Sequence, residues 1–215
     1  MEVSYYLIIA YLLTKVPVIG SYVRLINTIV HEMFHVMIAK ITGGKGYRIT
    51  LHADTSGQAK IGVPTWFSGI LISYAGYTGS SGMAFLLFYL LHQHFYIVVL
   101  FVFLIIAVIS TVLWIRNLFG VVWSISFVVV LWFFIHGQHD QAMIHTSYLL
   151  ASIILVESIT STFRIMLLSF RYPQQAGDAT SLQQSTKIPA LLWGMIFFVQ
   201  PVYFGYVIVT NYVLI

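Results

Sequence analysis

The stretch Ile26–Lys40, INTIVHEMFHVMIAK, decides how this chain is interpreted, because it places two histidines and a glutamate in an otherwise apolar helix. His31 and His35 are four residues apart, so on an α-helix their side chains project from nearly the same face. Two neutral imidazoles at this spacing can hold one zinc ion, and Glu32 lies within reach of a water activated by that zinc. The stretch therefore predicts a zinc site with a carboxylate as general base.

An alternative interpretation is that the histidines only fill space, as isolated histidines in apolar helices usually do. Glu32 argues against this alternative, because no lysine or arginine lies one helical turn away from it in the sequence. An ionisable side chain inside a membrane segment costs roughly 2.5 kcal/mol or more, and it usually marks a functional position. We therefore favour the metal site.

The composition indicates a membrane protein. The chain has 215 residues, of which 60% are hydrophobic and only 7% are charged, and this is too apolar for a soluble domain. We expect an all-α polytopic membrane protein in which residues 1–215 form a single domain. The net charge of +4 is ascribed to membrane topology and not to nucleic-acid binding. The absence of cysteine excludes disulfides and thiolate metal ligands.

Six to seven transmembrane helices are expected, with a short β-hairpin after the helix that carries the histidines. Tyr47–Gly62 favours the hairpin, because it combines alternating apolar and polar residues with a turn-like centre. The hairpin could be an ordinary surface feature, or its open edge could pair with an extended substrate. His52 and Asp54 within it are further candidate metal ligands. The predicted spans are residues 3–19, 22–41, 66–91, 95–115, 118–135, 142–170 and 190–214.

With seven spans, most basic residues fall on one side of the membrane. The positive-inside rule makes that side cytoplasmic. His35 precedes Ile41, the end of its span, by about 9 Å at a rise of roughly 1.5 Å per residue, so the site is expected just below the cytoplasmic surface. The basic residues on that side are Lys40, Lys45, Arg48, Lys60, Arg116, Arg164, Arg171 and Lys187.

Two further stretches have competing interpretations. Gly76, Gly79 and Gly82 lie in a segment of small residues, and we interpret them as positions where helices pack closely. The polar segment His136–His145 contains three histidines and Asp140, and its composition makes it an alternative candidate metal site. We favour exposed loop histidines there, because the predicted topology puts this segment on the opposite side from His31.

Two acidic residues leave alternatives open. Glu157 lies inside the sixth span and could be a third zinc ligand, a proton relay or a group that joins two helices by hydrogen bonds. Asp178 precedes a short helical stretch, TSLQQST, and could serve only as the N-cap of that helix.

Five stretches in order resemble successive motifs of the site-2 protease superfamily, and the compact "B-like" branch of that superfamily in particular. They are HEMFHVMIAKITGGK, ITLHADTSGQ, SYAGYTGSSGMAFLL, IRNLFG and GDATSLQQSTKIPALLWG. The resemblance extends over nearly the whole chain after the first predicted span. It implies a membrane-embedded zinc peptidase that cuts within or beside transmembrane segments.

The resemblance also assigns roles to residues. It implies that His31, His35 and Asp178 hold one Zn²⁺ per chain, and that Glu32 is the catalytic general base. The hairpin resembles the re-entrant strand element with which such proteases hold their substrates. Better-studied members take the third ligand from an Asn-Pro-Asp-Gly or Leu-Asp-Gly motif, and neither motif occurs here. The choice between Asp178 and Glu157 therefore stays open.

The sequence thus predicts an intramembrane zinc metalloprotease in a bacterial-type plasma membrane, with its active site towards the cytoplasm. The expected partners are the lipid bilayer and a transmembrane or membrane-adjacent protein substrate, locally unwound and held near Arg48–Asp54. Asn117 is expected to hydrogen-bond the oxyanion. Alternatives are a hydrolase acting on lipid or prenylated products, and a zinc-binding membrane regulator or transporter without catalysis.

Overall fold

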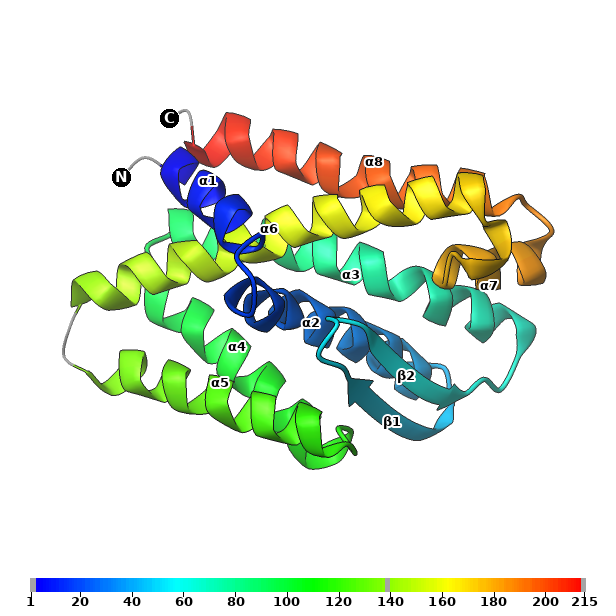
Figure 1. The fold of residues 1–215 in the computed structure, drawn as a ribbon, viewed down its shortest axis with the longest axis horizontal. Helices are drawn as coiled ribbons and strands as arrows, with labels where there is room; N and C mark the ends of the chain where they lie inside the picture. Colours follow the sequence, from blue (N-terminus) through cyan, green and yellow to red (C-terminus); the bar gives the residue numbers. More distant parts are fainter. Residues whose placement is uncertain (1–2, 138–139, 214–215) are drawn as a thin grey trace.

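The computed structural model describes residues 3–137 and 140–213, and it is a bundle of helices with one small hairpin at its end (Figure 1). The elements in chain order are α1 (Val3–Leu13), α2 (Ile19–Ile41), β1 (Lys45–Leu51), β2 (Gly57–Gly62), α3 (Trp66–His92), α4 (Tyr96–Leu113), α5 (Leu118–His136), α6 (Asp140–Arg171), α7 (Asp178–Thr186) and α8 (Ala190–Ile208). A 3₁₀ turn at Pro173–Gln175 precedes α7, and a π-helical turn at Val209–Val213 follows α8.

The prediction of a polytopic helical membrane protein is confirmed. Within the described residues, five helices are long and apolar enough to cross a bilayer, namely α3, α4, α5, α6 and α8. Their outer faces are apolar; Val122, Val129 and Phe133 of α5, for example, are exposed. Such a surface suits contact with lipid and not with water.

The first two helices correct the predicted order of spans. α1 has 11 residues, which cover roughly 16 Å, about half of the hydrocarbon core of a bilayer. Tyr6 of α1 stacks on Tyr148 near the beginning of α6, whereas Arg24 of α2 pairs with Glu157 in the middle of α6. α1 and α2 therefore follow each other in one direction along α6. They run as one interrupted path along the bundle, not as the two antiparallel spans that the sequence predicted.

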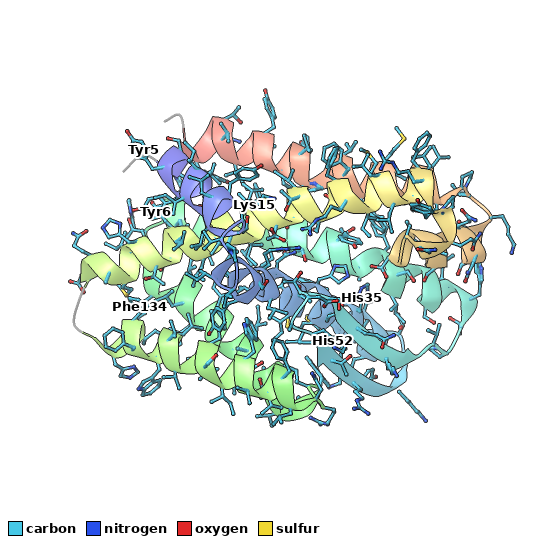
Figure 2. All side chains as sticks on the ribbon, viewed as in Figure 1. Tyr5, Tyr6, Lys15, His35, His52 and Phe134 are labelled. Atoms are coloured by element: carbon cyan, nitrogen blue, oxygen red, sulfur yellow. The ribbon has the colours of Figure 1, made fainter. Side chains whose placement is uncertain are left out.

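The interruption at residues 14–18 redirects the chain without reversing it. Pro17 has no backbone N–H for a continuing helix, and Val18 has a positive φ of 66°. Figure 2 labels Lys15 at this break, partway along the molecule. As a result the N- and C-terminal ends of the described chain lie together at one end of the bundle, and the hairpin and α7 lie at the other (Figure 1).

The hairpin predicted for Tyr47–Gly62 is confirmed as the antiparallel pair β1 and β2. β1 also has a partner on its other edge, because Ile49 forms a parallel bridge to Ile115 in the connection between α4 and α5. Asn117 extends this contact: its Nδ2 donates to Leu51 O at 2.7 Å, and its Oδ1 accepts from Leu51 N at 3.1 Å. The edge near Arg48–Asp54, expected to hold substrate, is therefore already occupied along β1.

The same contact shows that the predicted oxyanion role of Asn117 is wrong. Both the donor and the acceptor of its carboxamide are used on the backbone of Leu51, where they act like one further residue of a strand. Sequence reasoning placed Asn117 at the same end of the protein as the hairpin but could not show this long-range pairing.

The arrangement of α1 and α2 can be tested by labelling, because the chain has no native cysteine. We expect single cysteines at Ser4 and Gln93 to react with a membrane-impermeant maleimide from one side of sealed vesicles, and those at Lys60 and Lys187 only from the other. Two separate first spans would instead put Ser4 on the side of Lys60. Permeabilised vesicles, in which all four positions should react, provide the control.

Candidate metal centre

The helical spacing of α2 brings its two histidines to one point, as predicted. The Nε2 atoms of His31 and His35 lie 3.0 Å apart, and the two rings meet edge to face. His35 is only 6% exposed and lies inside the bundle (Figure 2). Two imidazole nitrogen atoms thus face a common point inside the bundle.

A backbone carbonyl fixes the orientation of His35. Its Nδ1 lies 2.6 Å from Ile72 O on α3, and a carbonyl oxygen can only accept a hydrogen bond. Nδ1 must therefore carry a proton, which leaves Nε2 of the neutral ring with a free lone pair. Histidine ligands of metals are commonly oriented by such a contact from the second ring nitrogen.

Asp178 completes a triad with these histidines. Its Oδ2 lies 3.3 Å from Nε2 of His31 and 3.3 Å from Nε2 of His35. Asp178 is the first residue of α7, and the N-cap is Gly177, whose φ is +53°. The alternative in which Asp178 is only an N-cap therefore does not describe the structure. Partial burial would raise the pKa of Asp178, but the two histidines hold it well below its ordinary value.

The spacing of the three ligand atoms fits a zinc ion. Ligands about 2.0–2.2 Å from a tetrahedral zinc lie roughly 3.3–3.6 Å from one another. The two separations that involve Asp178 are 3.3 Å and fall in this range, and the separation of 3.0 Å between the two Nε2 atoms is slightly shorter. Two imidazoles and one carboxylate also form a donor set common in catalytic zinc sites, which leave a fourth position open. Within the described residues, His31, His35 and Asp178 are the cluster that could hold a metal.

Gly76 on α3 makes room for the two rings. A Cβ atom at this position would lie 2.4 Å from Cε1 of His31 and 2.5 Å from Nε2 of His35. The three glycines that the sequence grouped together have different roles. Gly79 faces Phe34, which is the helix packing that we predicted, whereas a Cβ at Gly82 would meet nothing within 4 Å.

The triad opens into a cavity of about 680 Å³ that also contains Glu32. Glu32 is 6% exposed, and its Oε1 would lie 2.8 Å from a Cβ atom at Gly57, so β2 passes directly against its carboxylate. Gln58 and Ala59 of β2 line the same cavity. A potential base, a metal triad and the outer edge of a strand therefore face one space.

The other candidate ligands lie elsewhere. Glu157 forms ion pairs with Arg24 and Arg164 and does not contact the histidines. Oδ1 of Asp54 accepts hydrogen bonds from the backbone and hydroxyl of Ser56, and these bonds lower the pKa of its carboxyl group. The rival histidine segment 136–145 includes His139, which lies outside the described residues.

These features define an integral membrane protein whose helices enclose a triad that could hold a metal ion. The chain belongs to the Peptidase M50B-like family, whose sequence model matches residues 3–208. This finding confirms the resemblance to the B-like branch of the site-2 protease superfamily. No curated protein and no solved structure matches the chain.

Sequence reasoning missed the positions that shape the centre from α3. Gly76 and Ile72 are ordinary residues of an apolar segment, and their roles follow only from the approach of α3 to α2. The one available signal was the run of small residues around Gly76, which indicated a close contact without showing that imidazole rings make it.

We expect Gly76→Ala to abolish most metal binding, because the added methyl group would displace both imidazoles. Alanine is the better helix former, so the loss would not come from helix propensity. Gly82→Ala on the same helix is the matched control and should bind metal like the wild type. Metal per chain, measured on protein purified in detergent, distinguishes the two variants. Full occupancy in Gly76→Ala would contradict the geometry described here.

Proposed function

We propose that this protein is an intramembrane zinc metalloprotease that hydrolyses peptide bonds of membrane-protein substrates. The observation that carries the proposal is the triad of His31, His35 and Asp178, whose ligand atoms are spaced for zinc beside Glu32 in a cavity. Membership of a peptidase family supports the reaction class.

In this proposal each residue has one role. His31, His35 and Asp178 hold one Zn²⁺, which supplies Lewis-acid activation of water and of the substrate carbonyl. Glu32 takes a proton from the attacking water and passes it to the leaving amine. The backbone of Ile72 keeps Nε2 of His35 directed at the metal position.

The substrate is proposed to lie along β2. A peptide bond inside a helix is shielded and hydrogen-bonded, so the segment that is cut must be locally unwound. β1 lies between β2 and the Ile115–Asn117 connection, and the outer edge of β2 lines the cavity instead. An extended chain added at this edge would pass both Glu32 and the triad, which is the β-augmentation mode of binding.

The proposed location is a bacterial-type plasma membrane with the active site towards the cytoplasm. The hairpin and α7 lie at one end of the bundle (Figure 1), and the basic residues Lys45, Lys60 and Lys187 belong to that end. The positive-inside rule favours the cytoplasm for it.

The ligand set predicts zinc content. Wild-type protein should hold one zinc per chain, and Asp178→Ala should hold much less, because only two ligands remain. Asp140→Ala removes an exposed aspartate at the start of α6 and serves as the matched control. Zinc can be measured by elemental analysis of detergent-purified protein. Equal zinc in all three proteins would remove Asp178 from the ligand set.

The catalytic role of Glu32 predicts that its substitution affects cleavage but not zinc binding. Glu32→Gln should keep zinc but lose at least about a hundredfold of cleavage rate, the usual contribution of a general base. His31→Ala should lose both. The assay follows cleavage of a membrane segment with a helix-breaking centre. If Glu32→Gln keeps full activity, the mechanism is wrong. Bound zinc with no cleavage in the wild type would favour a non-catalytic regulator.

A further inference from the structure

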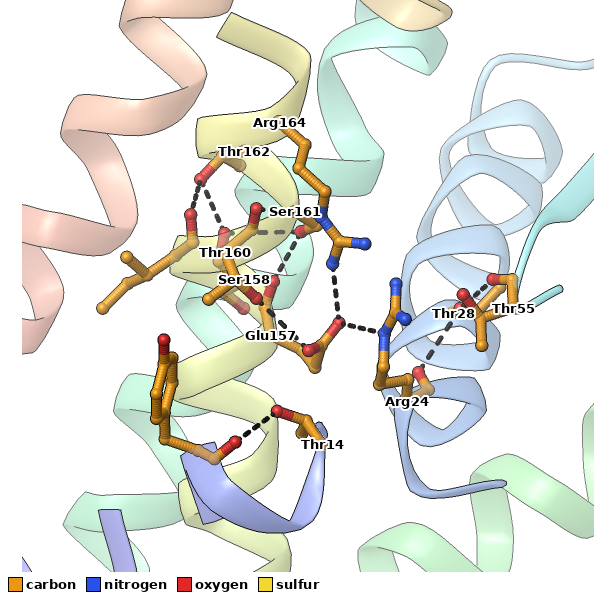
Figure 3. A network of polar contacts seen from close by, with 12 residues as sticks. Thr14, Arg24, Thr28, Thr55, Glu157, Ser158, Thr160, Ser161, Thr162 and Arg164 are labelled. Atoms are coloured by element: carbon orange, nitrogen blue, oxygen red, sulfur yellow. Dashed lines mark hydrogen bonds and ion pairs between the residues drawn. The ribbon is translucent and has the colours of Figure 1, made fainter. Parts of the chain in front are cut away.

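A second polar cluster lines the same cavity and is not used by the proposed mechanism. Arg24 of α2 and Arg164 of α6 both pair with Oε2 of Glu157, each at 3.2 Å (Figure 3). The two guanidinium groups approach this carboxylate from different helices. All three residues line the cavity that contains the metal triad.

The charges of this cluster do not balance. Among the described residues, both arginines form ion pairs with Glu157 alone, so two positive charges face one negative charge. One arginine would be enough to neutralise Glu157 and to join α2 to α6. A surplus charge in a membrane protein is costly unless water or an anion compensates it, so it commonly marks a functional position.

The surplus charge lies on the accessible side of the cluster. The Glu157 side chain is 5% exposed, whereas those of Arg24 and Arg164 are 24% and 48% exposed. A molecule that enters the cavity would therefore meet guanidinium groups before it meets the carboxylate.

Donors suited to an anion remain available on both arginines. Arg24 binds Glu157 through Nε, and its two terminal nitrogens have no hydrogen-bond partner among the described residues. Arg164 uses Nη2 on Glu157 and Nε on Thr160 O, which holds its side chain in place. Guanidinium groups bind carboxylates in short, charge-assisted pairs. The nearby carboxylate of Asp54 is engaged by Ser56 and pairs with neither arginine.

The cluster lies at a defined distance from the metal triad. Arg24 and His31 are two turns apart on one face of α2, which corresponds to about 10 Å. The hairpin runs along α2 between these two residues, because Gly57 lies against Glu32 and Thr28 Oγ1 donates to Thr55 O at 3.0 Å. An extended peptide advances roughly 3.3 Å per residue, so 10 Å corresponds to about three residues.

We propose that Arg24 and Arg164 form a subsite for a carboxylate of the peptide substrate, about three residues from the bond that is cleaved. The inference rests on the proposed peptidase function and adds a substrate class to it. The carboxylate is that of an aspartate or glutamate side chain, or the C-terminus of the substrate. Arg24 and Arg164 determine specificity and take no part in bond cleavage.

The test uses full-length protein in detergent and a peptide library with a randomised cleavage window. Mass spectrometry of the products should show Asp and Glu enriched roughly tenfold over Asn and Gln about three residues from the cut. The enrichment should approach one in Arg24→Gln and Arg164→Gln. Libraries with free and amidated C-termini separate a side-chain carboxylate from a terminal one.

Arg171→Gln is the matched control, because Arg171 lies two turns beyond Arg164 on α6, is exposed and lies outside the cavity lining. It should keep the wild-type enrichment. The enrichment is a ratio within one preparation, so partial misfolding of a variant does not change it. Arg24→Lys and Arg164→Lys should retain part of the preference, since they keep the charge.

A binding measurement separates this inference from the peptidase proposal. Glu32→Gln protein should bind an acidic peptide roughly tenfold more tightly than its amide counterpart. Selective binding without cleavage by the wild type would support the subsite and overturn the peptidase. Cleavage by the wild type without a preference for acidic residues would support the peptidase and overturn the subsite. Affinity for phosphatidylglycerol that depends on both arginines, with no peptide preference, would overturn the subsite in favour of a lipid phosphate.

Discussion

His31, His35 and Asp178 meet where α2, α3 and α7 approach one another, and the rest of the bundle is arranged around this approach. α3 comes close enough only because Gly76 has no side chain, and the same helix supplies the carbonyl that orients His35. α7 is short and could not hold its position alone. A small separate core that includes Ala179, Leu182 and Phe197 packs it against α8 and α3. The triad therefore depends on packing contributed by residues without any chemistry of their own.

α2 explains how a polar site can lie inside a protein whose outer surface is apolar. The five helices that qualify as membrane spans are apolar over long windows, whereas α2 carries Arg24, Asn27, Thr28 and the triad histidines towards the cavity. Hydrolysis needs water, and a bilayer core excludes it. A polar cavity at the hairpin end of the bundle resolves this conflict, because water can enter beside the hairpin while the outer helices remain in contact with lipid.

The sequence predicted the features that depend on local spacing. The histidine positions follow from helical periodicity, and the hairpin follows from alternation around a turn. Three other features depend on contacts distant in sequence. A break near Pro17 is visible in the sequence, but its turn geometry does not reveal whether the chain reverses or continues. The sequence around Asn117 is equally compatible with an Asn117 side chain that faces a substrate and with one that pairs with a strand. Gly76 has the same appearance whether it faces a helix or an imidazole. Asp178 was predicted as the third ligand by resemblance, since one aspartate at a helix start has many uses.

The bridge between β1 and the Ile115–Asn117 connection has a consequence for substrate choice. An isolated two-stranded ribbon is marginally stable, but here β1 is also paired with the Ile115–Asn117 connection. The outer edge of β2 is therefore ordered before a substrate binds. A rigid edge loses little entropy on pairing, and pairing along the strand involves only the backbone of the added chain, so any side-chain preference comes from other groups in the cavity. The energetic barrier then lies mainly in the substrate. Under the proposed function, a transmembrane segment would first have to release a few of its residues from the helix before any side chain is selected, and stable helices around the protein would survive without any need to be recognised.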